Sequence, residues 1–250
     1  MLTEEERMRY SRQLVIPEIG ETGQERLRSA RVAVVGAGGL GSPAAMYLAA
    51  AGVGTIGLVD GDVVDLSNLQ RQILHGVNHL GLAKVESAKR ALGRLNPGVH
   101  VVPHRMTIMP ENAAGLLEPY DVVVDAVDNL ETRYVVNDAC VRMAKPLVEA
   151  GVLRFDGMVL AVMPGRGPCY RCVFPSLPPP GAVPTAREAG IIGAVPGVIG
   201  SIEAMEAIKI ILGIGRPLAG RLLLFDALEM TWREVNASRD PNCPACGGLP

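Results

Sequence analysis

The amino-acid sequence predicts an α/β fold with a doubly wound sheet, parallel in its N-terminal half and extended by antiparallel strands. Between residues 31 and 152, short apolar segments alternate with segments of helical periodicity, an order that gives a parallel sheet with helices on both faces. The first apolar segment runs into a glycine turn and a helix, as in Rossmann-like folds. After Gly151 the connections shorten, which indicates antiparallel additions.

The individual elements follow in order. Thr3 and Glu6 have the spacing of a capping box and predict a first helix over residues 4–15. Ser42 is expected to cap the helix that follows the glycine turn, and Gly52 to end it. Strands are expected at 31–38, 55–60, 99–105, 121–128 and 146–152, and helices at 82–96, 111–119 and 131–143.

The C-terminal part has a different pattern. Apolar segments at 157–164 and 221–227 predict strands, and residues 198–213 predict a long helix. Between them, residues 175–190 are rich in proline and have no periodicity. A loop of this length inside a compact fold is usually functional or mobile. No linker, repeat or charge block divides the chain, so we expect one domain over residues 1–250.

Composition excludes several classes of protein. Of 250 residues, 48% are hydrophobic and 20% charged, and the formal net charge is −2. That balance does not favour a nucleic-acid partner. The N-terminus is charged and carries no signal peptide, and the most apolar later segment, residues 189–202, is interrupted by Pro196. A cytoplasmic protein with no membrane partner is therefore expected.

Four of the five cysteines form two C-x-x-C pairs, Cys169 with Cys172 and Cys243 with Cys246. Without a secretion signal, such pairs predict a zinc site, and four thiolates leave no open position for a substrate, which indicates a structural zinc knuckle. Disulfides or a redox dithiol are the alternatives. Cys140 is expected to be a buried helix cysteine.

The glycine turn has the pattern G-x-G-x-x-G at Gly36, Gly38 and Gly41, and the acid Asp60 ends the next apolar segment. Backbone N–H groups of such a turn, with the following helix, make an anion site, and Asp60 can accept hydrogen bonds from ribose hydroxyls. The pattern predicts a nucleotide but does not separate a dinucleotide from another phosphate. A tight turn without a ligand is the alternative.

Polar residues follow the glycine turn along the chain. Asn68, Arg71 and Gln72 are expected within reach of a phosphate tail, and Lys84 opens the next helix. Cations beside a triphosphate offset the charge that develops as pyrophosphate leaves. Asp128 ends an apolar segment and could hold Mg²⁺, or could cap the next helix together with Asn129. Solvated surface side chains are the alternative for each cation. The four histidines, His75, His79, His100 and His104, are expected to be structural or surface residues.

The chain resembles the ThiF/MoeB/HesA family, bacterial relatives of ubiquitin-activating enzymes, over nearly its whole length. The resemblance rests on segments that occur in the family's order: RYSRQ, GAGGLGSP, AGVGTIGLVDGDVVDLSNLQRQ, GLAKVESA, DAVDN, CYRC, PGVIGSIEAMEAIK and CPACG. It implies an enzyme that uses ATP and Mg²⁺ to adenylate the C-terminal Gly-Gly carboxylate of a ubiquitin-like sulfur carrier of the MoaD/ThiS type, in molybdopterin, thiamine or tRNA-thiolation pathways.

The resemblance also implies roles for residues. The catalytic residues would be Arg12, Arg71, Lys84 and Asp128. The residues of the ATP site would be Gly36, Gly38, Gly39, Gly41, Asp60, Asn68, Arg71, Lys84, Asp128 and Asn129. Arg12 would reach across a homodimer interface onto the partner's ATP, Asp128 would hold Mg²⁺, and the four paired cysteines would hold a structural Zn²⁺.

One position departs from the family. Ala186 stands in the crossover loop, about residues 175–190, where many members carry a cysteine that links covalently to the carrier. The chain also ends just after the second cysteine pair. We therefore expect simple adenylation, with sulfur supplied by a separate persulfide donor and no fused sulfurtransferase.

Three alternatives remain at this point: a superfamily relative that adenylates a small molecule or a tRNA base, an NAD-dependent oxidoreductase, and a carrier-binding scaffold without catalysis. The carboxylate is already ionised at neutral pH, so adenylation needs no general base. A hydride-transfer enzyme would need a Tyr-Lys or His-Asp pair, and none stands at the end of an expected strand.

Overall fold

The structure is a computed structural model that describes residues 1–179, 181–182 and 184–248. Its strands are β1 (Arg31–Val35), β2 (Thr55–Val59), β3 (His100–His104), β4 (Val122–Asp125), β5 (Leu147–Leu153), β6 (Asp156–Val162), β7 (Arg221–Asp226) and β8 (Thr231–Asn236). Its helices are α1 (Glu4–Arg9), α2 (Ser11–Leu14), α3 (Gly20–Ser29), α4 (Gly41–Ala51), α5 (Lys84–Leu95), α6 (Ala113–Leu117), α7 (Leu130–Arg142), α8 (Tyr170–Val173), α9 (Ala186–Ala189) and α10 (Ala194–Leu212), with 3₁₀ turns η1 (Leu66–Asn68) and η2 (Val77–His79).

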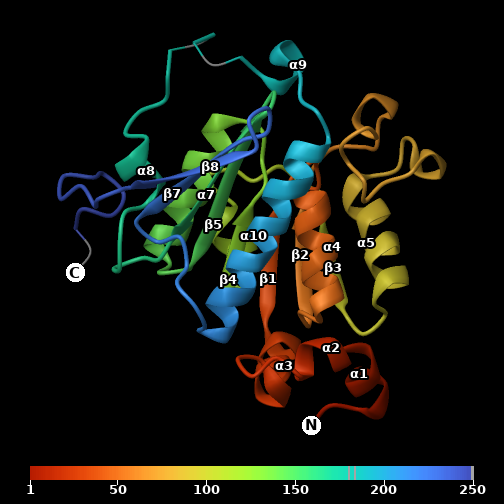
Figure 1. The fold of residues 1–250 in the computed structure, drawn as a ribbon. Coiled ribbons are helices and arrows are strands. Elements are labelled where there is room, and N and C mark those ends of the chain that lie inside the picture. The colour runs from red at the N-terminus through yellow and green to blue at the C-terminus, as the bar shows by residue number, and fades with distance from the viewer. Residues whose placement is uncertain (180, 183, 249–250) are drawn as a thin grey trace.

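The eight strands form one sheet in the order β3-β2-β1-β4-β5-β6-β7-β8 (Figure 1). The pairs from β3 to β5 are parallel, and the pairs from β5 to β8 are antiparallel. The predicted fold class is confirmed. Strand order reverses between β1 and β4, and ligands of such sheets bind at the carboxyl ends of the strands beside that reversal.

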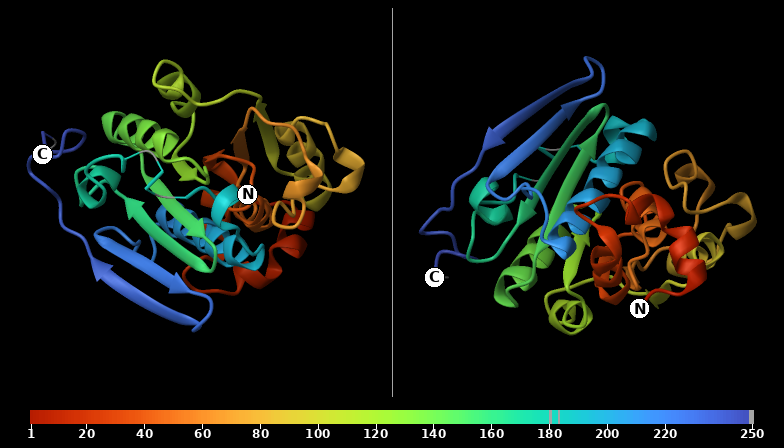
Figure 2. Two further views of the ribbon diagram at one scale, coloured as in Figure 1. Left: turned by 90° about the horizontal axis from the view of Figure 1, so that it is seen from above. Right: turned by 60° about the horizontal axis from the view of Figure 1, so that its bottom comes forward.

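Helices cover both faces of the sheet (Figure 2). One hydrophobic cluster joins α3, α4, α5 and α10 to one face, and a second joins α6, α7 and the four paired cysteines to the other. Strand β1 serves both clusters, because Val32 and Val34 point to the first and Ala33 and Val35 to the second. None of the helices in the described residues is long and apolar enough to cross a bilayer.

The first helix is divided. The capping box is confirmed: Thr3 Oγ1 accepts the N–H of Glu6 at 3.2 Å, and the Glu6 carboxylate accepts the N–H of Thr3 at 2.6 Å. A single helix over residues 4–15 is wrong, because the chain turns at Tyr10. The buried Tyr10 hydroxyl accepts a hydrogen bond from Asn96 at 2.8 Å. This hydrogen bond to a distant part of the chain holds Tyr10 in the turn, so the helix does not continue through it.

Helix α4 begins earlier than predicted. Its first residue is Gly41, so Ser42 lies inside the first turn and is not the cap. The Ser42 hydroxyl instead donates to the Gly38 carbonyl at 2.6 Å. Gly52 ends the helix in the left-handed conformation, φ 86°, as predicted.

Strand β4 ends at Asp125 and not at Asp128, because the Asp125 carboxylate accepts the N–H of Val127 at 3.2 Å and turns the chain. Helix α10 begins at Ala194, ahead of the predicted residue 198. Strand β8 and helix α3 were not expected from the sequence. Every residue of β8 is exposed, so this edge strand lacks the alternation that marks a half-buried strand.

Candidate functional site

A cavity of about 950 Å³ opens at the carboxyl ends of β1, β2 and β4. It lies where the strand order reverses, as this sheet topology predicts. Eight of the ten residues predicted for a nucleotide site line it: Gly36, Gly38, Gly39, Asp60, Arg71, Lys84, Asp128 and Asn129. Gly41 and Asn68 do not line the cavity, but each contacts a residue that does: Gly41 packs against Gly36, and Asn68 accepts a hydrogen bond from Arg71.

The glycines of the turn have two different reasons for being small. A Cβ on Gly36, φ 96°, would lie 2.7 Å from the Ala126 carbonyl oxygen, and a Cβ on Gly41 would lie 1.8 Å from the Gly36 carbonyl oxygen. These two glycines are required by packing. A Cβ on Gly38 or Gly39 would meet only ordinary contacts, at 3.6 Å and 3.4 Å. Packing does not require those two, whereas close approach of a ligand to the backbone would.

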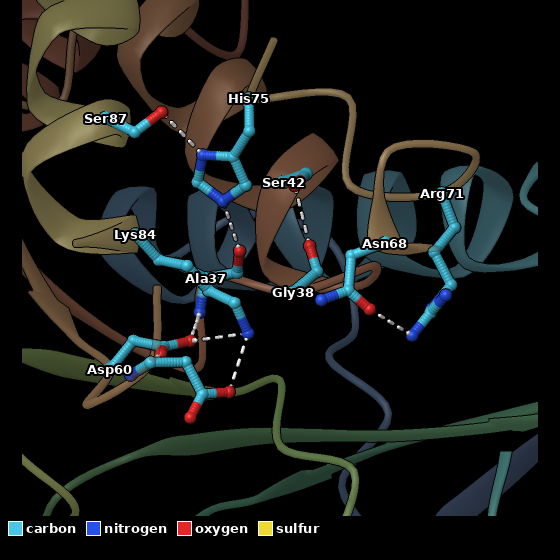
Figure 3. A network of polar contacts seen from close by, with 10 residues as sticks. Ala37, Gly38, Ser42, Asp60, Asn68, Arg71, His75, Lys84 and Ser87 are labelled. Atoms are coloured by element: carbon cyan, nitrogen blue, oxygen red, sulfur yellow. Dashed lines mark hydrogen bonds and ion pairs between the residues drawn. The ribbon is translucent and has the colours of Figure 1, made fainter. Parts of the chain in front are cut away.

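Asp60 and Lys84 form one wall of the cavity (Figure 3). The Asp60 carboxylate accepts the N–H groups of Ala37 at 2.9 Å and Asp62 at 2.8 Å. The buried Lys84 ammonium lies 3.9 Å from Asp60 Oδ2 and 2.8 Å from Asp62 Oδ2. A carboxylate has about four acceptor positions, so Asp60 retains capacity for ligand hydroxyls.

Arg71 lies on the other side of Gly38 in Figure 3. Its Nη2 donates to the Asn68 side chain at 2.9 Å, and its Nη1 donates to the Ser67 carbonyl at 3.3 Å. The short turn η1 that carries these acceptors is capped by Asp65, which accepts the Ser67 N–H at 2.8 Å. Asn68 therefore orients the guanidinium at the cavity.

Asp128 is exposed at the cavity, on the loop between β4 and α7. Asn129, and not Asp128, caps α7, because the Asn129 side chain accepts the Thr132 N–H at 2.9 Å. The Asp128 carboxylate thus faces the cavity without serving as the cap of α7.

Arg12 does not reach this cavity within its own chain. It is exposed on α2, beside the helix α3 that leads into the amino end of β1. Figure 1 shows α1, α2 and α3 at the end of the sheet opposite α9. The structure therefore separates Arg12 from the other predicted catalytic residues.

The four paired cysteines come together as predicted. Their sulfur atoms all lie within 4.8 Å of one another, with Sγ–Sγ distances of 3.9 Å for Cys169–Cys172, 3.6 Å for Cys169–Cys243 and 3.3 Å for Cys172–Cys246. Four thiolates at tetrahedral zinc distances are about 3.8 Å apart. None of the five cysteines forms a disulfide, so the disulfide alternative is wrong for this structure, and the cluster could hold a metal ion.

A buried charged cluster beneath the cavity was missed by sequence reasoning. Asp125 on β4 and Glu149 on β5 are paired in register, and Glu203 projects from α10. All three side chains are fully buried. Burial, followed by the neighbouring Asp125 carboxylate, raises the pKa of Glu149 and of Glu203 well above the usual range. The Arg133 guanidinium opposes that rise in the pKa of Glu149.

Arg133 of α7 is the cation of this cluster. It pairs with Glu149 and donates to the carbonyl of Val127 at 2.8 Å and to that of Ala150. Burial alone would lower the pKa of Arg133, but Glu149 and Asp125 raise it, so the guanidinium stays charged. Arg133 thereby ties the loop that carries Asp128 to strand β5. One sequence feature points to this cluster: the acids Asp125 and Glu149 stand inside otherwise apolar strand segments.

Comparison with known proteins gives consistent matches. The model of the ThiF family matches residues 10–245. The sulfur carrier protein adenylyltransferase of Thermus thermophilus is 52% identical over 99% of this chain and 93% of its own length. The adenylyltransferase and sulfurtransferase MOCS3 of Sus scrofa is 52% identical over the whole chain, which spans 55% of that protein.

The solved structure of E. coli MccB with ATP superimposes with a TM-score of 0.85 and 26% sequence identity. The match covers 96% of this chain and 75% of that one. The fold therefore agrees with a protein whose structure was determined with ATP.

The Arg133 cluster leads to a stability prediction. Replacing Arg133 by Met should lower the free energy of unfolding by about 3–5 kcal/mol, because Glu149 loses its buried counter-charge. Arg142→Met, on the exposed face of the same helix, should change it by less than about 0.5 kcal/mol. Urea unfolding measures both. Equal effects of the two substitutions would show that the cluster contributes nothing specific.

Proposed function

The chain belongs to the ThiF family, and we propose that it is an ATP-dependent adenylyltransferase that activates the C-terminal Gly-Gly carboxylate of a ubiquitin-like sulfur carrier. One observation carries the proposal: a glycine turn, two cations and an exposed carboxylate border one cavity at the reversal of strand order. The 52% identity to proteins named adenylyltransferases supports it and opposes the oxidoreductase and scaffold alternatives.

The chemistry suits this set of residues. An oxygen of the carrier's terminal carboxylate attacks the α-phosphorus of ATP, and the bond from that phosphorus to the bridging oxygen breaks. Pyrophosphate leaves with the electron pair, and no proton moves. Because both reactants are anions, the barrier falls when fixed cations and N–H donors face the phosphates. Arg71 and Lys84 supply the cations, and Gly38 and Gly39 supply the donors.

Asp60 and Asp128 divide two tasks. Asp60, fixed by the Ala37 and Asp62 N–H groups, accepts hydrogen bonds from the ribose hydroxyls. Asp128 fits a magnesium ligand because its exposed carboxylate is not used as a helix cap. Bound Mg²⁺ would neutralise charge on the phosphates. The remaining predicted residues, Asn68 and Asn129, orient Arg71 and begin α7.

The carrier's tail would enter beside the nucleotide. The cavity continues along residues 151–153 and 173–179, and the crossover loop, about residues 175–190, would guide a narrow Gly-Gly tail. Of that loop, Pro180 and Val183 lie outside the described residues. Ala186 lies in the short helix α9.

Adenylation without a covalent enzyme–carrier link fits the cysteine inventory. Apart from the four clustered cysteines, the sequence holds only Cys140. It is fully buried on α7, as predicted, and burial raises the pKa of its thiol. Such a thiol is a poor nucleophile. Sulfur would come from a separate persulfide donor.

A homodimer would complete the site. Because Arg12 lies far from the cavity of its own chain, it can act on ATP only from a second copy. The single continuous sheet supports one adenylyltransferase domain over residues 1–250. The four clustered cysteines would hold one structural Zn²⁺ that ties the C-terminal segment to α8.

Substitution of Asp128 tests the site. Asp128→Asn keeps the shape but removes the charge, so carrier-dependent ATP–pyrophosphate exchange should fall by about two to three orders of magnitude. The assay uses a MoaD- or ThiS-type carrier, intact or without its Gly-Gly tail. The exposed Glu118 lies outside the cavity lining, and Glu118→Gln should exchange normally. Exchange by Asp128→Asn at the wild-type rate would refute the magnesium assignment.

Mixing variants tests the shared site. Arg12→Ala and Asp128→Asn should each be inactive alone. In a random mixture half of the dimers are mixed, and each has one intact site if Arg12 acts on its partner, so about a quarter of wild-type activity should return. If subunit exchange is demonstrated and no activity returns, Arg12 does not act across the interface.

Metal analysis tests the cysteine cluster. Plasma mass spectrometry should find one zinc per chain, and Cys246→Ser should lose zinc and melt at a lower temperature because the cluster no longer closes. Cys140→Ala should keep its zinc. Full thermal stability of a zinc-free protein would contradict a structural role.

A further inference from the structure

We propose that His75 is a positioning residue for the phosphates of the bound nucleotide. It holds the Ala37 carbonyl on the side away from the ligand, so that the Gly38 N–H faces the cavity. The inference rests on the proposed function in one respect, namely that the cavity takes ATP.

His75 acts from behind the glycine turn. Its Nε2 lies 2.9 Å from the Ala37 carbonyl oxygen, and its Nδ1 lies 2.9 Å from Ser87 Oγ (Figure 3). His79 Nδ1 lies 2.8 Å from the same Ser87 oxygen. All three side chains are buried, and neither histidine lines the large cavity. They belong to α5 and to the segment before it, which pack behind the turn.

The direction of each hydrogen bond in the series Ala37–His75–Ser87–His79 follows from the Ala37 carbonyl at one end of it. A carbonyl can only accept, so His75 Nε2 carries the proton and donates to Ala37. In the neutral ring Nδ1 then accepts from the Ser87 hydroxyl, and the Ser87 oxygen accepts from His79. Burial, with a contribution from the nearby Lys84 charge, lowers the pKa of His75. The neutral ring with the proton on Nε2 is thus the form present at neutral pH.

Fixing one carbonyl fixes the next N–H group. No peptide bond in the described residues is cis, and in a trans peptide the C=O and the following N–H point in opposite directions. Because the Ala37 carbonyl points to His75, the Gly38 N–H points away from it. The same holds one residue later, because the Gly38 carbonyl accepts from the Ser42 N–H at 3.0 Å and from the Ser42 hydroxyl at 2.6 Å.

These two N–H groups are the donors that the phosphate site needs. Neither the Gly38 nor the Gly39 N–H has an acceptor among the described residues, whereas the Ala37 N–H is used by Asp60. Both glycines line the cavity. A glycine turn is otherwise free to rotate its peptides. His75 and Ser42 hold two successive peptides in the orientation that binds an anion, which lowers the cost of binding.

The test separates phosphate binding from the rest of nucleotide binding. Calorimetry measures the dissociation constants of ATP and adenosine for wild type, His75→Ala and His75→Gln. His75→Ala should weaken ATP binding by about tenfold or more, since the Gly38 N–H is then free to turn away from the charged phosphate, and adenosine binding by less than about twofold. His75→Gln should recover much of the ATP affinity, because its amide N–H replaces Nε2. His100→Ala, exposed on β3, is the matched control and should change neither constant.

A second variant leaves His75 in place. Ser87→Ala removes the hydrogen bond that fixes the imidazole ring at Nδ1, so the ring can turn and Nε2 holds the Ala37 carbonyl less firmly. The same selective loss of ATP affinity should follow. Circular dichroism checks that each variant folds. If His75→Ala does not fold, the smaller Ser87→Ala change still tests the inference.

The outcomes are distinguishable. If wild type binds ATP no more tightly than adenosine, the proposed function fails and the inference fails with it. If wild type prefers ATP and folded variants lose ATP and adenosine equally, only the inference is overturned, because His75 is then a structural residue. Failure of His75→Gln to improve on His75→Ala would overturn it too.

Discussion

The close approach of backbone segments at the glycine turn is the constraint on which the rest of the structure depends. A Cβ on Gly41 would lie 1.8 Å from the Gly36 carbonyl oxygen, and a Cβ on Gly36 would lie 2.7 Å from that of Ala126. Because both side chains are absent, α4 can begin directly behind β1 while β4 passes beside it. Helix α10 repeats the principle, since a Cβ on Gly200 would lie 2.3 Å from the Leu40 carbonyl oxygen.

That arrangement determines where the charges stand. The turn that leads into α4 faces the cavity with the N–H groups of Gly38 and Gly39, which have no acceptor among the described residues, at the helix end that carries a partial positive charge. The segment between β2 and α5 brings Arg71 and Lys84 to either side of the turn (Figure 3). The loop after β4 brings Asp128 to the same place, held by Arg133. The proposed adenylation site therefore combines backbone N–H groups with four charged side chains, those of Asp60, Arg71, Lys84 and Asp128.

Sequence reasoning found the parts of the site that are local. The glycine turn, Asp60 and the paired cysteines have fixed spacings, and their geometry follows from the spacing. Propensity predicts Ser42 as a helix cap, because propensity alone cannot show that its hydroxyl donates to the Gly38 carbonyl. The sequence predicts Asp128 at a strand end because the pattern does not reveal the turn that Asp125 makes with the Val127 N–H. Arg133, Glu149, Glu203 and His75 act through partners brought together by the fold, so no local pattern marks them. Strand β8 is exposed throughout and carries no apolar alternation.

If the cavity transfers the adenylyl group of ATP to a carrier's terminal carboxylate, the α-phosphate of ATP becomes attached to the carrier. The most direct measurement incubates the protein and a Gly-Gly carrier with ATP labelled at either the α- or the γ-phosphate, and follows the label on the carrier in an acid-quenched gel. Label from the α-phosphate should move to the carrier, and label from the γ-phosphate should leave in pyrophosphate. Transfer of the γ-label to the carrier, or transfer of neither label, would contradict adenylyl transfer.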